Sequence, residues 1–246
     1  MSRVLVLGAT SAIAAHIARR HAARGDSLFL VGRNPDKLGR LRSELRASVV
    51  GHLECDLDDT AANAGRIDGA IAALGGVDVA VLAHGLLGDQ RASEGDWAVA
   101  EQILCTNLLS AISLLIPLAN HCEAARAGRI AVLSSVAGER GRPRNYTYGA
   151  AKAALNVYLQ GLRSRLWSAG VSVHTLKLGP VDTPMTMHHP KNLLFSRADA
   201  VAAQIIAAVD RGVAEAYVPG YWRPLLGIVR ALPEPIFQRI AALSER

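Results

Sequence analysis

Short apolar runs that alternate with amphipathic stretches constrain the fold of this chain more than any other feature. The first run, RVLVLG at residues 3–8, is typical of a strand buried on both faces of a sheet. A helical pattern follows it, and the same order recurs along the chain. The predicted strands span residues 3–8, 27–32, 49–56, 77–85, 128–135, 171–180 and 215–219, and the predicted helices span residues 11–24, 35–47, 60–74, most of 94–127, 146–170 and 197–211.

Repeated β-α units predict a parallel sheet with helices on both faces. The chain has 246 residues, of which 50% are hydrophobic, and this is enough for one large core. We therefore expect an α/β protein with a single-domain, doubly wound Rossmann fold, whose central parallel sheet has about seven strands. Residues 1–220 are expected to form this domain, and residues 221–246 an amphipathic extension packed on it.

Polar and small residues follow the predicted strands directly. In open parallel sheets, ligands bind in the crevice at the carboxyl ends of the strands. The candidate residues at these ends are Gly8–Ser11, Arg33, Asp56, Gly85, Ser134–Ser135 and Gly179–Thr183. The sequence therefore predicts one ligand site at this edge of the sheet.

The charge and the cysteines narrow the classes of function. The formal net charge is +6, but no basic block with interleaved aromatic residues is present, so we expect no nucleic-acid partner. The positive charge suits an anionic cofactor, substrate or membrane surface instead. Cys55, Cys105 and Cys122 lack metal or redox spacing, which indicates a reducing compartment. The N-terminus enters an apolar strand at once and shows no signal peptide, which favours a cytoplasmic protein.

One apolar segment, Ile103–Cys122, contains no Asp, Glu, Lys or Arg and has the length of a membrane span. A helix that is apolar on all sides can also be buried inside a large protein or at a subunit interface. The segment includes Asn107 and Pro117, and we favour a buried helix over a membrane span.

The sequence LGATSAIA joins the first predicted strand to the first helix. Gly8 permits a tight turn there, and the start of the helix offers N–H groups to a pyrophosphate. The dinucleotide-binding fingerprint has three glycines, but Ala12 and Ala14 occupy the later small positions. Taken alone, this turn predicts a dinucleotide site only weakly.

Arg33 bears on the choice of cofactor. It follows the second predicted strand, where proteins that prefer NAD often carry an acid for the ribose 2′-hydroxyl. An arginine at this place can instead pair with a 2′-phosphate through charge-assisted hydrogen bonds. The sequence therefore favours NADP(H), with NAD(H) as the alternative.

The stretch NYTYGAAKAALN contains two tyrosines and one lysine. Lys152 lies four residues after Tyr148 and six after Tyr146, and only the first spacing places both side chains on one face of a helix. We expect the Lys152 ammonium to stabilise the Tyr148 phenolate and to lower the pKa of Tyr148 toward neutrality, which would make Tyr148 a general acid or base. Ser135 ends the preceding strand, so its hydroxyl and the Tyr148 phenol can converge on one carbonyl oxygen.

These motifs together resemble the short-chain dehydrogenase/reductase family over nearly the full chain. GATSAIA resembles its glycine-rich turn, CDLDD its adenine-contacting acid, AHG its NAG motif and LGPVDTPM its PGPVxTPM motif, and the family's Ser and YxxxK set is present. The resemblance implies that Ser135, Tyr148, Lys152 and Asn107 are catalytic. It implies cofactor contacts at Gly8, Thr10, Ser11, Ala12, Ile13, Arg33, Asp56, Leu57, Ala83, His84, Gly85, Tyr148, Lys152, Gly179, Val181 and Thr183.

The resemblance also implies a mechanism. NADPH delivers hydride to a ketone, Tyr148 protonates the developing alkoxide, and Ser135 holds that oxygen. Lys152 lowers the pKa of Tyr148 and hydrogen-bonds the nicotinamide ribose, while Asn107 holds a water that links Lys152 to solvent.

The chain departs from the family pattern at four places. Ala12 and Ala14 replace glycines, Ala83 replaces the asparagine of NAG, and Leu178 replaces a proline. A non-catalytic NADP(H)-binding sensor is the alternative that these changes favour. The intact Ser135, Tyr148 and Lys152 set favours an enzyme.

The substrate loop and the C-terminal segment bear on the substrate. In residues 184–196, His188 and His189 are adjacent but lack further spaced metal ligands, so we expect no metal, and Lys191 either binds an anion or keeps the loop soluble. Residues 221–246 combine Trp222 and Phe237 with arginines, so this segment either lies on a membrane surface at the inner face or packs on protein.

Within the family, SSVAGER, YGAAKAAL and VRALPEPIFQRI resemble reductases of a polyprenyl-phosphate-linked 2-ketopentose. This resemblance implies a lipid-linked ketone substrate. A 3-oxoacyl group or a simple small-molecule ketone is the alternative.

Many family members form subunit contacts through the helices that correspond to Leu108–Ala119 and to the Tyr148 helix, so a homodimer or homotetramer is expected.

Overall fold

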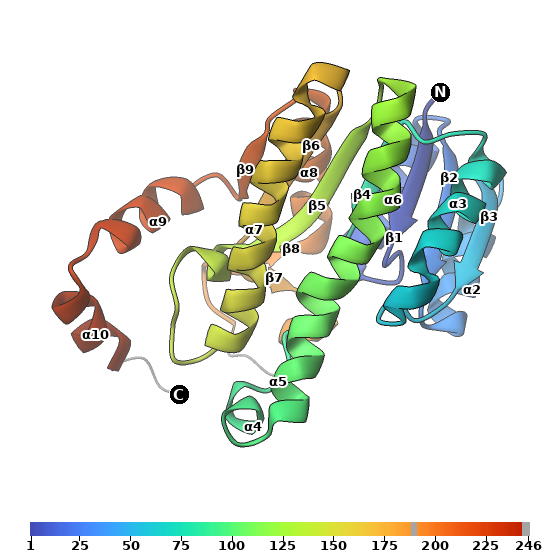
Figure 1. Cartoon of the computed structure of the whole chain (residues 1–246). Helices are drawn as coiled ribbons and strands as arrows, with labels where there is room; N and C mark the ends of the chain where they lie inside the picture. The colour runs from blue at the N-terminus through green and yellow to red at the C-terminus, as the bar shows by residue number, and fades with distance from the viewer. Residues whose placement is uncertain (188–190, 243–246) are drawn as a thin grey trace.

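A seven-stranded parallel sheet forms the centre of the molecule in the computed structural model, which describes residues 1–187 and 191–242 (Figure 1). The strand order is β3-β2-β1-β4-β5-β6-β9, so the chain reverses direction across the sheet after β3. The predicted α/β doubly wound fold is therefore confirmed. The strands are β1 (Arg3–Leu7), β2 (Ser27–Gly32), β3 (Val49–Glu54), β4 (Val79–Leu82), β5 (Arg129–Ser135), β6 (Ser172–Leu178) and β9 (Glu215–Val218).

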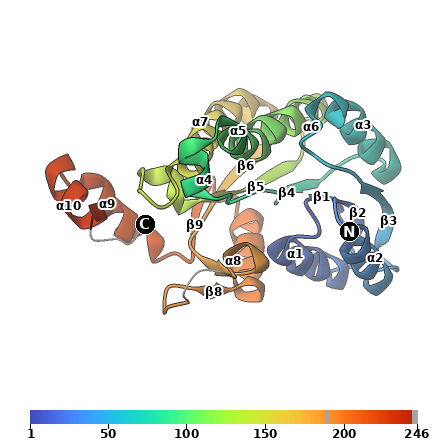
Figure 2. The ribbon, with the colours of Figure 1, turned by 90° about the horizontal axis from the view of Figure 1, so that it is seen from below.

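Helices cover both faces of the sheet, as Figure 2 shows from below. Helices α1 (Ala12–Ala23), α2 (Pro35–Glu44) and α8 (Ala198–Asp210) lie on one face. The other face carries α3 (Asn63–Leu74), α4 (Gln90–Gly95), α5 (Trp97–Leu104), α6 (Ser110–Ala125) and α7 (Tyr146–Leu166).

Local signals in the sequence explain where several helices begin and end. The Ser11 hydroxyl accepts a hydrogen bond from the Ala14 N–H (3.3 Å) and caps α1, and Asn34 caps α2 ahead of Pro35 at its first turn. Helix α3 ends at Gly75, whose φ of 69° is left-handed. These caps fix the ends of the helices that follow β1 and β2, beside the carboxyl ends of the strands.

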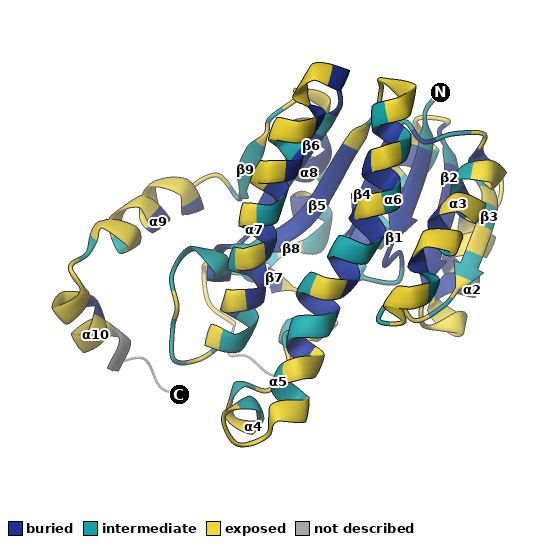
Figure 3. Cartoon of the chain, in the orientation of Figure 1, coloured by how far each residue is buried: buried dark blue, intermediate teal, exposed yellow. Residues whose placement is uncertain are grey.

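The core consists of two apolar layers, one on each face of the sheet, and the strands β1, β2, β4, β5 and β6 between them are buried (Figure 3). Leu5 faces the layer under α3, α6 and α7, whereas Val4 and Val6 face the layer under α1 and α8. Alternate side chains of one strand thus enter both layers, which explains why the strand runs are apolar throughout.

The long apolar helix of the sequence is continuous from Trp97 to Ala125, with a π-helical turn at Cys105–Leu109 between α5 and α6. Its length and mean hydropathy of 1.8 would suit a membrane span, but it lies on the sheet between α3 and α7, and 50% of its most apolar window is buried. The predicted buried helix is therefore buried on the side that packs against the sheet, and its other side is not.

The C-terminal arm, which we define as residues 221–242, leaves the body after β9 and contains α9 (Trp222–Ala231) and α10 (Glu234–Ala242) (Figure 1). Trp222 and Leu226 of α9 pack against Val136, which directly follows β5. Ile228, Ile236 and other apolar side chains of the arm are exposed. The arm therefore touches the body through a narrow contact.

The elements not anticipated from the sequence are short. Strands β7 (Val181–Asp182) and β8 (Ser196–Arg197) form a separate two-stranded sheet that joins the two ends of the segment between them. Two-residue strands have too few residues to show a period, so no pattern marks them. Short 3₁₀ turns follow β3, β5, α7 and β7 at η1 (Thr60–Ala62), η3 (Val136–Glu139), η4 (Trp167–Ala169) and η5 (Pro184–Thr186).

Candidate active site

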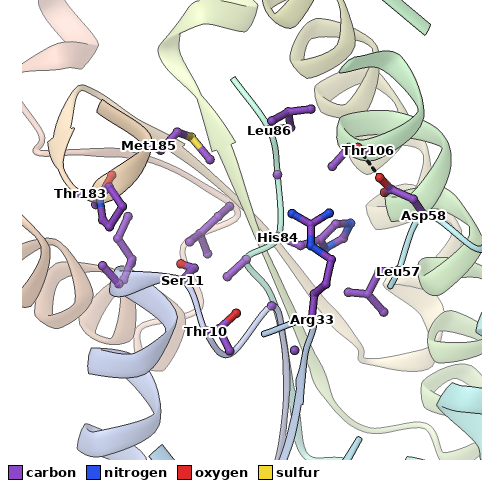
Figure 4. Close-up of a pocket in the computed structure, with 18 of the residues that line it drawn as sticks. Thr10, Ser11, Arg33, Leu57, Asp58, His84, Leu86, Thr106, Thr183 and Met185 are labelled. Atoms are coloured by element: carbon purple, nitrogen blue, oxygen red, sulfur yellow. Dashed lines mark hydrogen bonds between the residues drawn. The ribbon is translucent and has the colours of Figure 1, made fainter. Parts of the chain in front are cut away.

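A cavity of about 410 Å³ lies at the carboxyl ends of the central strands (Figure 4). This volume is in the range of small-molecule and cofactor sites. Most of the residues expected at the site line it, whereas Ser135, Asn107, Gly179 and Val181 do not. The predicted residues that line the cavity are Gly8, Thr10, Ser11, Ala12, Ile13, Arg33, Asp56, Leu57, Ala83, His84, Gly85, Tyr148, Lys152 and Thr183.

Gly8 makes the turn from β1 into α1 at the floor of the cavity. Its φ is 80°, and a Cβ at this position would lie 2.6 Å from the backbone nitrogen of His84. Only glycine therefore fits where the loop after β1 crosses the loop after β4. Ala12 and Ala14 are accommodated, since Ala14 is fully buried in the core and Ala12 lines the cavity. The turn keeps the start of α1 at the cavity without the later glycines of the fingerprint.

Two cations lie at the β2 end of the cavity. Arg33, which extends from the end of β2 in Figure 4, lines the cavity together with Lys37 of α2. The Arg33 side chain is 71% exposed and its guanidinium lies 3.6 Å from the Asp56 carboxylate. No strong ion pair holds it, so both cations are available to an anionic ligand.

His84 lines the cavity beside the Gly8 turn. Its Nε2 forms a 2.9 Å hydrogen bond with the Ser110 hydroxyl, and its Nδ1 is buried and has no hydrogen-bond partner among the described residues. Desolvation, assisted by the Lys152 charge, lowers the pKa of His84 to about 3, so the imidazole is neutral. A buried ring nitrogen without a partner is costly, and a ligand hydroxyl would satisfy it.

Ser135, Tyr148 and Lys152 come together at the other end of the cavity. Ser135 ends β5, Tyr148 lies in the first turn of α7, and the Ser135 hydroxyl is close enough to the phenol to lower its pKa. The Ser135 hydroxyl oxygen also accepts a 3.1 Å hydrogen bond from the Ala137 N–H. The Lys152 Nζ donates to the Leu133 carbonyl at 3.3 Å and lies 5.7 Å from the centroid of the Tyr148 ring. Tyr146, by contrast, is 45% exposed and does not line the cavity.

The prediction that Lys152 lowers the pKa of Tyr148 toward neutrality is wrong for the protein alone. Desolvation raises the pKa of Tyr148 to about 12, although the hydrogen bond with Ser135 offsets part of this effect. Desolvation also lowers the pKa of Lys152 to about 8. Both groups are removed from water together, and the loss of hydration outweighs the attraction of ammonium for phenolate. At neutral pH the phenol keeps its proton and can donate it.

Asn107 lies in the π-helical turn and is buried. Its amide donates to the carbonyls of Leu86 (2.6 Å) and Ile103 (2.8 Å), and its Oδ1 accepts from the Leu86 N–H (3.2 Å). A Cβ on Gly85 would lie 3.0 Å from Asn107 Oδ1 and 3.7 Å from Lys152 Nζ, so the two side chains border the same glycine. The structure thus places Asn107 near Lys152, with its polar atoms bonded to the backbone.

The loop after β6 forms the remaining wall. Thr183, Pro184 and Met185 line the cavity, while Gly179 lies under the Trp222 indole and Val181 is buried in the β7–β8 pairing. The Lys191 ammonium pairs with Asp182 at 2.7 Å. His188 and His189 lie outside the described residues, and no cluster of three or more His, Cys, Asp or Glu forms within residues 1–187 and 191–242.

Several cavity residues were not anticipated from the sequence. Lys37 lies four residues beyond Arg33, and a second cation so close to the end of β2 was a signal that could have been used. Asp58 accepts hydrogen bonds from Thr106 (2.6 Å) and Gln102 (2.8 Å), so it ties the loop after β3 to the long helix. Ser134, Pro184 and Met185 were expected at a strand end or in residues 184–196, and the other cavity residues outside the prediction are Gly32, Cys55, Leu86, Thr106, Leu133 and Leu178.

These residues fit a phosphorylated dinucleotide. The cavity runs from two cations, past the start of α1 and an unpartnered imidazole nitrogen, to the Tyr148 phenol. The cations and the N–H groups at the start of α1 can bind phosphates, and the imidazole nitrogen can form a hydrogen bond with a ligand hydroxyl.

Solved structures share this architecture. A short-chain dehydrogenase from Burkholderia cenocepacia J2315 in complex with NADP has a TM-score of 0.85 at 20% identity and matches 99% of this chain and 98% of its own. A short chain dehydrogenase/reductase family protein has a TM-score of 0.78 at 23% identity, over 87% and 94% of the two chains. At these identities the similarity shows the fold alone.

Curated relatives match at higher identity. An uncharacterized oxidoreductase of Mycobacterium tuberculosis (strain ATCC 25618 / H37Rv) is 36% identical over 240 residues, 96% of each chain. One from Streptomyces coelicolor is 34% identical over 96% of this chain and 95% of its own. A hydroxysteroid 11-beta-dehydrogenase 1-like protein of Xenopus tropicalis is 31% identical over 91% of this chain and 81% of its own.

The family model of short chain dehydrogenases matches residues 2–193, which include the Gly8 turn, Ser135, Tyr148 and Lys152. With the parallel sheet and the cavity at its carboxyl edge, this match shows that the chain belongs to the short-chain dehydrogenase family and is an oxidoreductase that acts on a CH–OH group.

Proposed function

We propose that the protein reduces a ketone to a secondary alcohol with NADPH, and that Tyr148 is the proton donor. The observation that carries this proposal is the position of Tyr148 and Lys152, one helical turn apart, in the cavity that begins at the start of α1, with Ser135 beside Tyr148. When bound, the cofactor supplies the hydride.

The protein groups handle the proton. The Tyr148 phenol, whose pKa desolvation raises to about 12, is protonated at neutral pH and gives its proton to the oxygen that gains negative charge. The Ser135 oxygen accepts from the Ala137 N–H, and the Ser135 hydroxyl donates its own hydrogen to the substrate oxygen when a ketone is bound.

NADP(H) is the proposed cofactor, with NAD(H) as the alternative. Arg33 and Lys37 both line the β2 end of the cavity, and no acid ends β2. A guanidinium and an ammonium can share a 2′-phosphate. The NADP complex of the Burkholderia cenocepacia dehydrogenase supports this choice.

The test is NADPH consumption with a panel of ketones, measured by absorbance for the parent protein and for Tyr148→Phe. We expect the substitution to lower kcat by about 100-fold or more, the range of a lost general acid, while the NADPH Kd changes less than about twofold. Tyr146→Phe, which alters an exposed tyrosine in the same turn, is the matched control. Turnover retained by Tyr148→Phe would refute the assignment.

For the substrate we propose a lipid-linked keto-sugar that carries a phosphate. Met185 lines the cavity, and Leu193 and Leu194 of the same loop are exposed. Arg142, in the loop between Ser135 and Tyr148, is partly buried and has no ion pair among the described residues, so it can meet an anionic group. This supports the sequence likeness to polyprenyl-phosphate ketopentose reductases, with a 3-oxoacyl or simple ketone as the alternative.

Contact with a membrane surface belongs to the same proposal. Ile228, Ile236 and Ile240 of the C-terminal arm are exposed, in a protein of net charge +6. We expect co-sedimentation with anionic phospholipid vesicles, and loss of most of this binding in an Ile228→Glu, Ile236→Glu variant. Equal sedimentation of both proteins would show that the arm does not bind the lipid.

A further inference from the structure

The C-terminal arm contacts two of the loops that build the active site. The Trp222 indole is 6% exposed and packs with Leu226 on Val136, the residue after Ser135. The same indole covers Gly179 so closely that no side chain could be placed there. One aromatic side chain from outside the sheet thus touches the end of β5 and the end of β6.

A buried ion pair of the body and an exposed arginine of the arm meet at the serine turn, which we define as residues 135–140. The Lys177 ammonium lies 2.5 Å from the Glu139 carboxylate and 2.7 Å from that of Glu215. The side chains of Lys177 and Glu139 are 5% and 4% exposed, so this charge pair is desolvated. The second carboxylate oxygen of Glu139 accepts a 3.2 Å hydrogen bond from the Arg230 guanidinium of α9. The Arg230 side chain is 60% exposed, so it adds a surface ion pair between the arm and the buried Glu139.

Arg140 is a second connection between the serine turn and the arm. Its guanidinium donates to the carbonyls of Val229 (2.5 Å) and Leu232 (2.8 Å) and pairs with Glu234 at 2.7 Å. It also lies over the Phe237 ring, 3.8 Å from the centroid. The two carbonyls are at the C-terminal end of α9, where a cation is favoured. This single side chain therefore holds both helices of the arm.

The opposite side of the serine turn packs on the helix that carries the catalytic tyrosine. A Cβ on Gly138 would lie 2.8 Å from Ala153 N and 2.8 Å from Lys152 C, and a Cβ on Gly149 would lie 2.9 Å from the Ala137 carbonyl oxygen. The serine turn therefore packs closely against α7 on one side and contacts the arm on the other side.

We infer that the C-terminal arm is a positioning element of the active site, and that Arg140 and Trp222 hold Ser135 in register with Tyr148. This inference rests on the proposed function for its catalytic consequence. When the arm leaves, the serine turn loses its outer support and the Ser135 hydroxyl no longer shares the substrate oxygen with the phenol. In the sheet, β4 separates β1 and β2 from β5, so the phosphate contacts expected at the β1 and β2 end of the cavity remain when the arm leaves.

Trp222 provides the reporter for a test. The chain has three tryptophans, and Trp97 and Trp167 are 68% and 80% exposed. In the Trp97→Phe, Trp167→Phe background, acrylamide quenching of Trp222 fluorescence measures docking of the arm. Arg140→Ala removes the connection, and Arg239→Ala, an exposed arginine of α10, is the control of equal charge. Where Arg140→Ala folds poorly, Phe237→Leu weakens the same contact more mildly.

We expect Arg140→Ala to make Trp222 quenchable, to lower kcat by about tenfold or more, and to leave the NADPH Kd within about twofold. Hydrogen–deuterium exchange of residues 135–148 should rise in this variant and stay unchanged in Arg239→Ala. A quenchable Trp222 with unchanged exchange and unchanged kcat would overturn the inference.

The exchange measurement separates this inference from the proposed function. If the parent protein reduces no ketone, the proposed function fails, yet faster exchange of residues 135–148 on undocking still shows that the arm orders the serine turn. If the parent protein turns over and Arg140→Ala keeps full kcat with a quenchable Trp222, only the positioning role fails.

Discussion

Tyr148 and Lys152 are desolvated at the same end of the cavity, and this acts on their pKa values in opposite directions. The pKa of Tyr148 is raised to about 12 and that of Lys152 is lowered to about 8. Each shift favours the neutral form of the group. Burying these two side chains therefore lowers the free energy of unfolding wherever either group is charged in the unfolded chain. This loss should depend on pH.

The Lys152 shift predicts a pH-dependent cost of folding. The folded state binds the Lys152 proton less readily than the unfolded state, whose pKa is near the ordinary 10.5, so the fold gains stability as the pH rises from about 8 to 10.5. Lys152→Met should therefore be more stable than the parent near pH 7, by up to about 3 kcal/mol, and the difference should fade above about pH 10. Urea unfolding of both proteins at several pH values measures it, and a difference that is constant with pH would contradict the desolvation of Lys152.

Arg33 and Lys37 predict the cofactor preference. Arg33→Ala and Lys37→Ala should each weaken NADPH binding by about 10-fold or more, the value of a charge-assisted contact, with little change for NADH. Arg40→Ala, an exposed arginine of α2 outside the cavity, is the control. Calorimetric titration gives the constants. An unchanged ratio of NADPH to NADH affinity in both variants would mean that these cations do not bind a 2′-phosphate.

At the residue scale, the sequence predicted which side chains meet at the site better than it predicted their pKa values. The four-residue spacing distinguished Tyr148 from Tyr146, because a helix turn brings residues four apart to one face. The direction of the Tyr148 pKa shift could not be predicted, since it depends on how much water the folded chain removes from both groups. The unpartnered nitrogen of His84 likewise depends on how the loop after β4 meets α6.

At the scale of elements, the serine turn and α7 fit so closely that a methyl group should separate them. Gly138→Ala would place a Cβ 2.8 Å from backbone atoms of α7, so we expect a loss of stability of about 1–3 kcal/mol and a lower kcat. Gly141→Ala is the matched control, because no atom lies within 4 Å of its Cβ position. Thermal unfolding of the two variants gives the comparison. Equal stability would show that the turn can move away from α7 at little cost.

The strands and main helices were predictable because their signals are local. Apolar runs mark buried strands, and Ser11 and Asn34 mark helix starts. The π-helical turn at Asn107 and the contact of Arg140 with α9 have no such signal. They arise where segments distant in the sequence meet, and a single sequence does not encode such pairings in a local pattern.

At the scale of the whole molecule, exposed apolar side chains remain on the π-helical turn, α6 and α7. Leu109, Ile116 and Val157 are 50%, 49% and 67% exposed. We propose that these side chains join two copies of the chain, as the family likeness implies, so the protein should be a dimer or tetramer in light scattering at micromolar concentration. Val157→Glu should shift it toward the monomer, and Trp167→Glu, at an exposed site after α7, should not. A monomeric parent protein would contradict this proposal.

Hydride transfer to a carbonyl carbon beside Tyr148 is the claim on which the account depends. The most direct measurement uses NADPH that carries deuterium at the transferable position of the nicotinamide, a ketone accepted by the protein, and mass spectrometry of the alcohol product. Hydride transfer from NADPH predicts one deuterium on the carbon that bears the new hydroxyl, and none when deuterium is supplied only by the solvent. An alcohol product without deuterium on that carbon would contradict it.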